Sequence, residues 1–120
     1  MAEKVSNPRG FRDFLPQQLA RRQYIQGVMV EVFRQYGFMP LETPAMEHLS
    51  TLTGKYGEEG DQLLYRVLNS GDYLKDLSPE ELTQLPSAEL APRICDRALR
   101  YDLTVPFARA VVQHRNELTS

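Results

Sequence analysis

Residues 99–109 (LRYDLTVPFAR) place a carboxylate and a hydroxyl two positions apart, at Asp102 and Thr104. Side chains at positions i and i+2 of a strand point to the same side, so a strand ending here would direct both groups into one small site. A carboxylate beside a hydroxyl oxygen suits the protonated amine of an amino acid. In the plainer alternative, Asp102 pairs with Arg100 or Arg109 and Thr104 only caps the following helix. The residues by themselves favour that alternative.

The other residues that could do chemistry form no recognisable site. The glycines of residues 54–60 are spaced GxxGxxG, but they lack the preceding strand and the Lys-Ser/Thr pair of a phosphate-binding loop. We therefore expect a flexible loop, with Lys55 and Tyr56 at its apex able to close over a ligand. The histidines and the single cysteine have no partners at metal-ligand or nucleophile–base spacing, and no metal site is expected; they are His48, His114 and Cys95. Cys95 is interpreted as a small buried hydrophobe.

A long amphipathic helix is predicted over residues 16–36. Apolar residues recur at the spacing of one helical face, namely Ile25, Val28, Met29, Val32, Phe33 and Tyr36. Pro16 suits the first helical turn, where no amide N–H is needed. Gly37 follows the last apolar residue and suits the left-handed position that ends a helix.

Shorter elements are predicted after Gly37. In chain order we expect an extended edge segment over 38–46, helical turns over 46–53, a polar loop over 54–61, a strand over 63–68 and a turn over 69–72. A helix opened by Ser78, Pro79 and Glu81 ends at Pro86, followed by a second short helix or an irregular stretch up to Arg97. A strand over 99–103 and a helix over 105–117 come last, the helix capped by Thr104 and facing inward with Ala108, Val111 and Val112. This order predicts an α+β domain.

The composition is that of one soluble domain. The chain has 120 residues, 42% hydrophobic and 25% charged, with a mean hydropathy of −0.44. No run approaches 18 apolar residues, which excludes a membrane-spanning helix, and one cysteine excludes a disulfide framework and zinc sites built on cysteine pairs. We therefore expect a cytoplasmic protein. The net charge of −2 combines basic ends (residues 1–41 and 93–120) with an acidic middle (42–92), so nucleic acid would contact the ends or protein beyond this chain.

Three segments together resemble the N-terminal part of the histidyl-tRNA synthetases, which are class II aminoacyl-tRNA synthetases. They are residues 9–16 (RGFRDFLP), 52–58 (LTGKYGE) and 99–109. The resemblance implies a catalytic domain built on an antiparallel sheet flanked by helices. It also implies a homodimer formed through motif 1, here residues 17–46, with a long helix over about 17–36 followed by a strand with an embedded proline. The interface residues would be Ile25, Met29, Phe33 and Pro44.

The resemblance also implies substrates and a site. The family joins L-histidine and ATP to histidyl-adenylate and then transfers the histidyl group to tRNA(His), with ATP used together with Mg²⁺. By resemblance, Asp102 and Thr104 hold the histidine α-amino group, with Leu103 between them, which reverses the preference stated above. Lys55 and Tyr56 would belong to a loop near the active site.

Residues 1–120 are accordingly expected to be an N-terminal fragment of that catalytic domain. The second and third class II motifs and an anticodon-binding domain do not occur in the sequence, and residues 70–97 are interpreted as an insertion. The fragment alone is expected to be inactive and to bind no cofactor. Two alternatives stay open: the synthetase-like regulatory subunit of ATP phosphoribosyltransferase, and a dimerisation module only. The residue types at positions 100–104 (RYDLT) and 55–57 (KYG) favour the ligase over the regulatory subunit.

Overall fold

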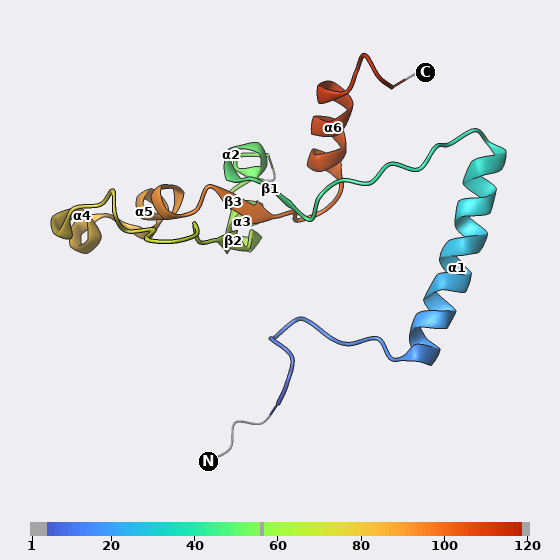
Figure 1. The fold of residues 1–120 in the computed structure, drawn as a ribbon, viewed down its shortest axis with the longest axis horizontal. Coiled ribbons are helices and arrows are strands. Elements are labelled where there is room, and N and C mark those ends of the chain that lie inside the picture. The colour runs from blue at the N-terminus through green and yellow to red at the C-terminus, as the bar shows by residue number, and fades with distance from the viewer. Residues whose placement is uncertain (1–4, 56, 119–120) are drawn as a thin grey trace. The chain divides into compact units, whose positions relative to one another are not determined.

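A computed structural model describes residues 5–55 and 57–118, which divide into two compact units, Met1–Leu41 and Glu42–Ser120 (Figure 1). Each unit has its own elements and is treated by itself. No helix within the described residues is long and apolar enough to cross a membrane.

The N-terminal unit consists of an irregular arm and one helix, α1, Pro16–Gln35. The arm packs locally, because the guanidinium groups of Arg12 and Arg22 lie 4.6 and 4.2 Å from the centroid of the Phe14 ring. The helix ends where the sequence predicts, since Gly37 has a φ of +81° and its amide donates to the carbonyl of Arg34 at 3.0 Å. The predicted long helix and its glycine stop are therefore confirmed.

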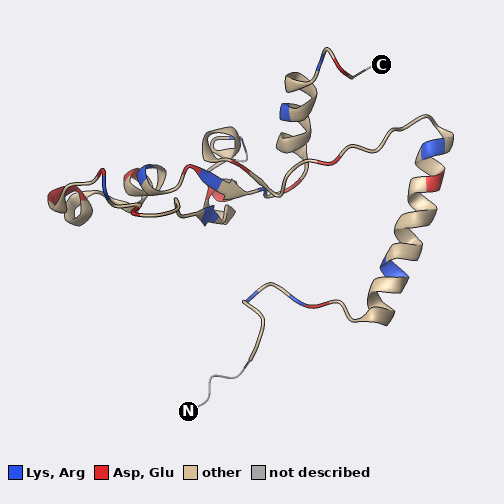
Figure 2. Cartoon of the chain, in the orientation of Figure 1, with Lys and Arg blue, Asp and Glu red and all other residues tan. Residues whose placement is uncertain are grey.

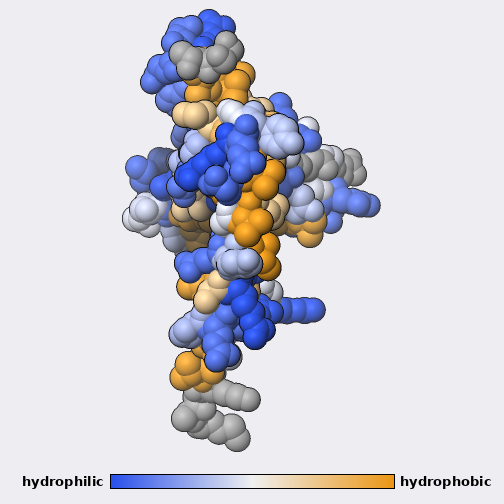
Figure 3. All heavy atoms as spheres, turned by 90° about the vertical axis from the view of Figure 1, so that its right-hand side faces the viewer, coloured by the Kyte–Doolittle hydropathy of each residue, from blue (hydrophilic) through white to orange (hydrophobic). Residues whose placement is uncertain are grey.

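The apolar face of α1 is not covered by its own unit. No residue of the helix is buried. Ile25, Met29 and Phe33 are 58%, 54% and 50% exposed. Phe33 makes one ring contact, an edge-to-face arrangement with Phe38 at 5.5 Å between centroids. Figure 3 looks onto the side of the molecule that carries α1 and shows apolar side chains in a band along it.

The C-terminal unit is built on a three-stranded antiparallel sheet, which confirms the α+β class with an antiparallel sheet flanked by helices. The strands are β1 (Met46–His48), β2 (Arg66–Val67) and β3 (Arg97–Leu99), in the order β1-β3-β2. Ala98 lies at the centre of the sheet, opposite Glu47 of β1 and Arg66 of β2. The helices are α2 (Leu49–Leu52), α3 (Gly57–Leu63), α4 (Pro79–Gln84), α5 (Ser87–Ile94) and α6 (Thr104–Gln113).

A small core lies around the middle strand. Its buried members are Leu49, Leu52, Leu64, Cys95 and Ala98, with Ile94 and Val105 packed against them. Leu52 is fully buried. Burial raises the pKa of the Cys95 thiol, because desolvation disfavours the thiolate. The interpretation of Cys95 as a small buried hydrophobe is therefore confirmed.

Several predicted boundaries in the first half of this unit are wrong. The edge segment expected over 38–46 is irregular, and the strand begins only at Met46, after the prolines that have no amide N–H to donate. The helical turns expected from Met46 begin at Leu49. The polar loop expected over 54–61 is helical from Gly57. The strand expected over 63–68 is reduced to Arg66–Val67.

The last strand and helix are also shifted from their predicted positions. Strand β3 ends at Leu99 rather than at residue 103, because its pairing continues only through the Arg100 amide, which donates to the Ala45 carbonyl at 2.9 Å. The next position along β1 is Pro44, which cannot donate to the ladder. Helix α6 ends at Gln113, and its buried residues are Pro106 and Ala110. The residues expected to face inward, Ala108, Val111 and Val112, are exposed.

Residues 70–96 form a helical excursion between β2 and β3, so the insertion predicted over 70–97 ends on the first residue of β3. The predicted cap of α4 is confirmed: the Ser78 amide donates to Glu81 Oε2 at 2.8 Å, and the Glu81 amide donates to Ser78 Oγ at 3.1 Å. The second short helix is α5, tied to α4 by an Arg93–Glu81 ion pair at 3.4 Å. Figure 2 shows the acidic residues of α4 and the basic residue of α5 in this excursion.

Candidate functional site

The structure brings Asp102 and Thr104 together, although not on a strand as predicted. Residues 101–103 form a turn, and Thr104 is the first residue of α6. The Thr104 amide donates to Asp102 Oδ1 at 2.9 Å, and the Thr104 hydroxyl donates to Asp102 Oδ2 at 3.3 Å. The carboxylate thus lies at the N-terminus of a helix, where the helix dipole favours negative charge.

Both side chains, and that of Leu103 between them, face solvent. Leu103 is 61% exposed and occupies the N-cap position of α6. Asp102 accepts two hydrogen bonds from Thr104, and both side chains are exposed. The turn therefore offers a negative charge and a hydroxyl oxygen at one exposed point.

Arginine contacts hold this segment at both ends. On one side, Arg100 Nη1 donates to the Thr43 carbonyl at 2.7 Å and to the Thr43 hydroxyl at 3.0 Å. On the other side, Arg109 donates two hydrogen bonds to Glu47, at 2.6 Å from Nη2 to Oε1 and 3.2 Å from Nε to Oε2. Both arginines therefore reach the short stretch at residues 43–47 that precedes and includes β1.

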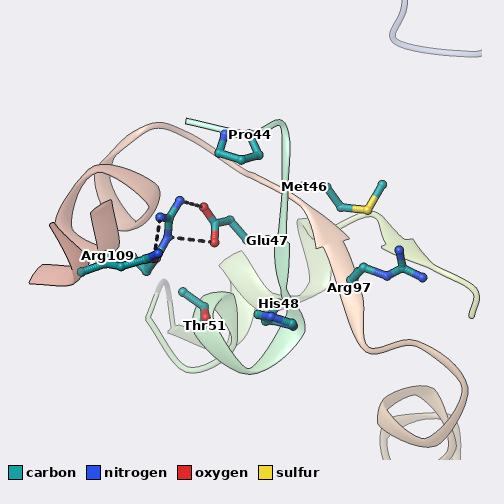
Figure 4. A pocket seen from close by; sticks show the side chains of 8 residues that line it. Pro44, Met46, Glu47, His48, Thr51, Arg97 and Arg109 are labelled. Atoms are coloured by element: carbon teal, nitrogen blue, oxygen red, sulfur yellow. Dashed lines mark hydrogen bonds and ion pairs between the residues drawn. The ribbon is translucent and has the colours of Figure 1, made fainter. Parts of the chain in front are cut away.

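The Glu47–Arg109 ion pair lies in the wall of a pocket of about 320 Å³. The lining residues are Pro44, Met46, Glu47, His48, Thr51, Arg97, Arg109 and Gln113. In Figure 4 the two charged side chains point toward each other across the pocket, from β1 and α6. The Glu47 side chain is only 6% exposed and that of Arg109 27%, so the carboxylate is almost removed from water.

The predicted loop residues can be placed in part. Lys55 lines a second pocket, of about 560 Å³, together with residues of α2 and α6. The loop is held at Gly54, whose amide donates to both carboxylate oxygens of Asp61 at 3.0 and 3.1 Å. Tyr56 lies outside the described residues.

The predicted interface residues fall in different units. Ile25, Met29 and Phe33 share the exposed face of α1. Pro44 belongs to the C-terminal unit, where it lines the pocket beside Glu47.

Sequence reasoning missed Thr43 and Glu47, which are both buried polar residues. Glu47 and Arg109 are 62 positions apart, and no spacing rule joins them. The available signal was a charged residue inside a mostly apolar stretch, residues 45–49, because a carboxylate that is buried with its strand requires a partner.

Comparisons with known proteins agree on one family. The sequence profile described as Histidyl-tRNA synthetase matches residues 10–80, more than half of the chain. The histidine–tRNA ligase of Bacteroides fragilis (strain YCH46) is 55% identical over 119 residues, covering 99% of this chain. That of Porphyromonas gingivalis is 57% identical over 116 residues, covering 97% of this chain. The chain spans about a quarter of the length of these relatives, 26% in each case.

Two solved structures resemble the fold. The histidyl-tRNA synthetase from Nostoc sp. PCC 7120 matches with a TM-score of 0.64 and 33% identity, over 95% of this chain and 21% of that one. An ATP phosphoribosyltransferase regulatory subunit/histidyl-tRNA synthetase from Bacillus halodurans matches with a TM-score of 0.66, over all of this chain and 26% of that one. At 21% identity the second likeness shows the fold alone.

These matches place the chain among proteins of the aminoacyl-tRNA synthetase type. Within that class, the chain belongs to the histidyl-tRNA synthetase family.

Proposed function

We propose that these residues form the N-terminal part of the catalytic domain of a histidine–tRNA ligase. The observation that carries the proposal is the Asp102–Thr104 turn at the start of α6, in a chain 55% identical to a histidine–tRNA ligase over nearly its whole length. The complete enzyme would activate L-histidine with ATP and transfer the histidyl group to tRNA(His). It would act in the cytoplasm.

The role of the turn is to hold the α-amino group of histidine. The ammonium group would donate to the Asp102 carboxylate and to the Thr104 hydroxyl oxygen, which already lie within 3.3 Å of each other. Because Thr104 donates both its amide and its hydroxyl hydrogen to Asp102, the hydroxyl lone pairs can accept from the ligand. Leu103 would shape the exposed edge of the site between them.

The reaction itself takes place in two steps. The histidine carboxylate attacks the α-phosphorus of ATP, the bond to pyrophosphate breaks, and histidyl-adenylate forms. A ribose hydroxyl of the 3′-terminal adenosine of tRNA(His) then attacks the histidyl carbonyl and releases AMP. This chain's turn contributes orientation, since it fixes the amino end of histidine while the carboxylate end reacts.

ATP and Mg²⁺ belong to this proposal only through the complete enzyme. Among residues 5–55 and 57–118, no three His, Cys, Asp or Glu side chains gather closely enough to hold a metal ion. No step is therefore assigned here to Mg²⁺. Lys55, exposed at the edge of its pocket, is the cation of this loop that could approach a bound phosphate.

A homodimer through α1 is the second part of the proposal. The apolar face with Ile25, Met29 and Phe33 is uncovered in its own unit, and a second copy would bury it. Pro44, on the segment leading into β1, is the interface residue that the proposal assigns to the C-terminal unit.

The regulatory alternative has weaker support. The protein whose title combines a regulatory subunit with a synthetase is 21% identical to this chain, whereas the histidine–tRNA ligases are 55–57% identical. A dimerisation module alone would not need the Asp102–Thr104 turn.

The test is histidine-dependent ATP–pyrophosphate exchange with the product of the complete reading frame, and with the variant Asp102→Asn. Asparagine keeps a side-chain oxygen that can accept from the Thr104 amide, so the turn persists while the charge is lost. A charged hydrogen bond contributes about 1.5–3 kcal/mol, so the histidine KM should rise roughly 10- to 150-fold with little change in the ATP KM. The 120-residue chain alone should be inactive.

The matched control is Asp96→Asn. This variant removes the charge of an exposed aspartate that lies just before β3 and pairs with Arg97 at 3.0 Å. It should leave both KM values unchanged. An unchanged histidine KM in Asp102→Asn would contradict the site assignment. Absence of exchange in the complete wild-type protein, with histidine still bound, would favour the regulatory alternative.

A further inference from the structure

The Glu47–Arg109 pair is more than an incidental surface contact. Its two hydrogen bonds, at 2.6 and 3.2 Å, are bidentate, and the carboxylate is 6% exposed. By contrast, the other arginine–glutamate pair that the structure shows, Arg93–Glu81, has side chains that are 47% and 38% exposed and a single contact at 3.4 Å. A bidentate arginine–carboxylate pair fixes the angle between its two elements as well as their distance.

The pair ties the strand to the helix that carries the proposed site. Glu47 lies at the centre of β1, and Arg109 lies five residues after Thr104 on α6. A helix rises about 1.5 Å per residue, so Arg109 lies about 7–8 Å along the axis from the turn on a continuous hydrogen-bonded element. Any rotation of α6 about its axis would therefore move both Arg109 and the turn.

The other end of the segment is anchored to the same stretch of chain. Arg100 binds the carbonyl and hydroxyl of Thr43, four residues before Glu47. The residues between Arg100 and Arg109, with the Asp102–Thr104 turn among them, are thus held at both ends to residues 43–47. The exposed turn itself has no comparable burial to fix its direction.

We propose that Glu47 and Arg109 are positioning residues that set the direction in which Asp102 and Thr104 present their oxygens to the histidine amino group. They act through α6 and do not touch the substrate. This inference rests on the proposed function of the turn. Gln113, which accepts from Arg109 Nη1 at 3.1 Å, braces the arginine from the next turn of the same helix.

The decisive variant is the double substitution Glu47→Leu/Arg109→Met in the complete protein. Replacing a buried ion pair by apolar side chains of similar volume often leaves stability unchanged. Removing only one partner, by contrast, leaves a buried charge without a counter-charge and destabilises the fold. The double variant therefore keeps the fold but loses the directional tie. The histidine KM should rise at least about 10-fold while the ATP KM stays near wild type, because misplacing a bound group by about 1 Å is costly.

A second readout does not depend on activity. The Thr104 amide, which donates to Asp102, should exchange its hydrogen faster in the double variant, while the Arg100 amide, which donates to Ala45, should exchange as in wild type. If the double variant fails to fold, Arg109→Lys replaces it: lysine keeps the charge but cannot form the bidentate contact, and the same two readouts apply.

The matched control is Glu81→Leu/Arg93→Met, which removes an arginine–glutamate pair of the excursion and should leave the histidine KM and the Thr104 amide unchanged. A folded Glu47→Leu/Arg109→Met protein with a wild-type histidine KM and wild-type exchange at Thr104 would overturn the proposal. If the wild-type protein shows no pyrophosphate exchange at all, the proposed function fails, and the Thr104 amide alone decides whether the pair positions the turn.

Discussion

The two units of the chain obtain their structure in opposite ways. Helix α1 is 20 residues long and regular, yet it buries none of its side chains. The unit around β3 has helices of 4–10 residues and strands of two or three, yet it encloses Leu52 and Ala98 completely. The first unit is therefore determined by neighbours in sequence, and the second by contacts between distant segments.

This difference has a functional meaning. A helix of this length is marginal in water when nothing packs on it, so α1 needs a covering surface to be stable. The sheet unit supplies its own core, and with it a frame that can hold the Asp102–Thr104 turn. The proposed dimer would cover the helix of the first unit, whereas the second unit is held by its own core.

The largest expected effect comes from a substitution in the core of the sheet unit, compared with one on α1. Leu52→Ala removes a fully buried side chain and should destabilise the sheet unit by about 2–5 kcal/mol. Urea unfolding followed by circular dichroism would measure the change. The matched variant on α1 is Val28→Ala, where valine is 51% exposed; it should change the stability of the unassociated chain by well under about 1 kcal/mol. Equal effects from the two variants would erase the distinction between the units.

The next effect concerns the surface that α1 leaves open. Met29→Lys places a charge in the middle of the apolar face and should weaken self-association of the complete protein at least 10-fold, about 1.4 kcal/mol. Sedimentation velocity over a range of concentrations would measure it. Gln23→Lys is the control, because position 23 lies on the side of the same helix opposite the six-residue apolar stripe, and it should leave association unchanged. A wild-type protein that stays monomeric would contradict the dimer.

The contrast also explains what the sequence could predict. Helix α1, its glycine stop and the Ser78 cap depend on residues within four positions of one another, and all three are confirmed. The boundaries of β1, β2 and β3 depend on partners 30–53 residues away. The end of β3, for example, is set by Pro44 opposite it, which the local pattern of 99–103 does not contain.

The candidate site shows the same division. The spacing of Asp102 and Thr104 predicts that they lie together, and they do contact each other, but in a turn that precedes α6 and not on a strand. The pair that braces them, Glu47 and Arg109, joins segments 62 residues apart and leaves no periodic signal. The role proposed for the turn comes from the resemblance to a family, whereas the contacts proposed to hold it are seen only in the folded chain.

The smallest expected effect concerns the N-cap of α4. This cap is a local contact inside the unit whose fold depends on contacts between distant segments. Ser78→Ala removes the hydroxyl that accepts from the Glu81 amide and should destabilise α4 by about 1 kcal/mol, a roughly 5-fold faster hydrogen exchange in that helix. The amides of α6 should be unaffected, because its first amide, that of Thr104, donates to Asp102 and not to a residue of α4. Faster exchange throughout the unit would mean that α4 is not an independent element.

Acidification should weaken the same N-cap of α4 by protonating the Glu81 carboxylate. The Ser78 amide donates to the Glu81 carboxylate, and this bond is the main cause that lowers the pKa of Glu81, with a smaller contribution from Arg93. A lowered pKa means that the folded state favours the carboxylate, so the stabilisation is present above the ordinary glutamate pKa and disappears as the pH falls through the lowered value. Hydrogen exchange of α4 should therefore quicken, relative to α6, on acidification. In Glu81→Gln that difference should be absent, whereas in Ser78→Ala, which keeps the backbone N–H, it should persist.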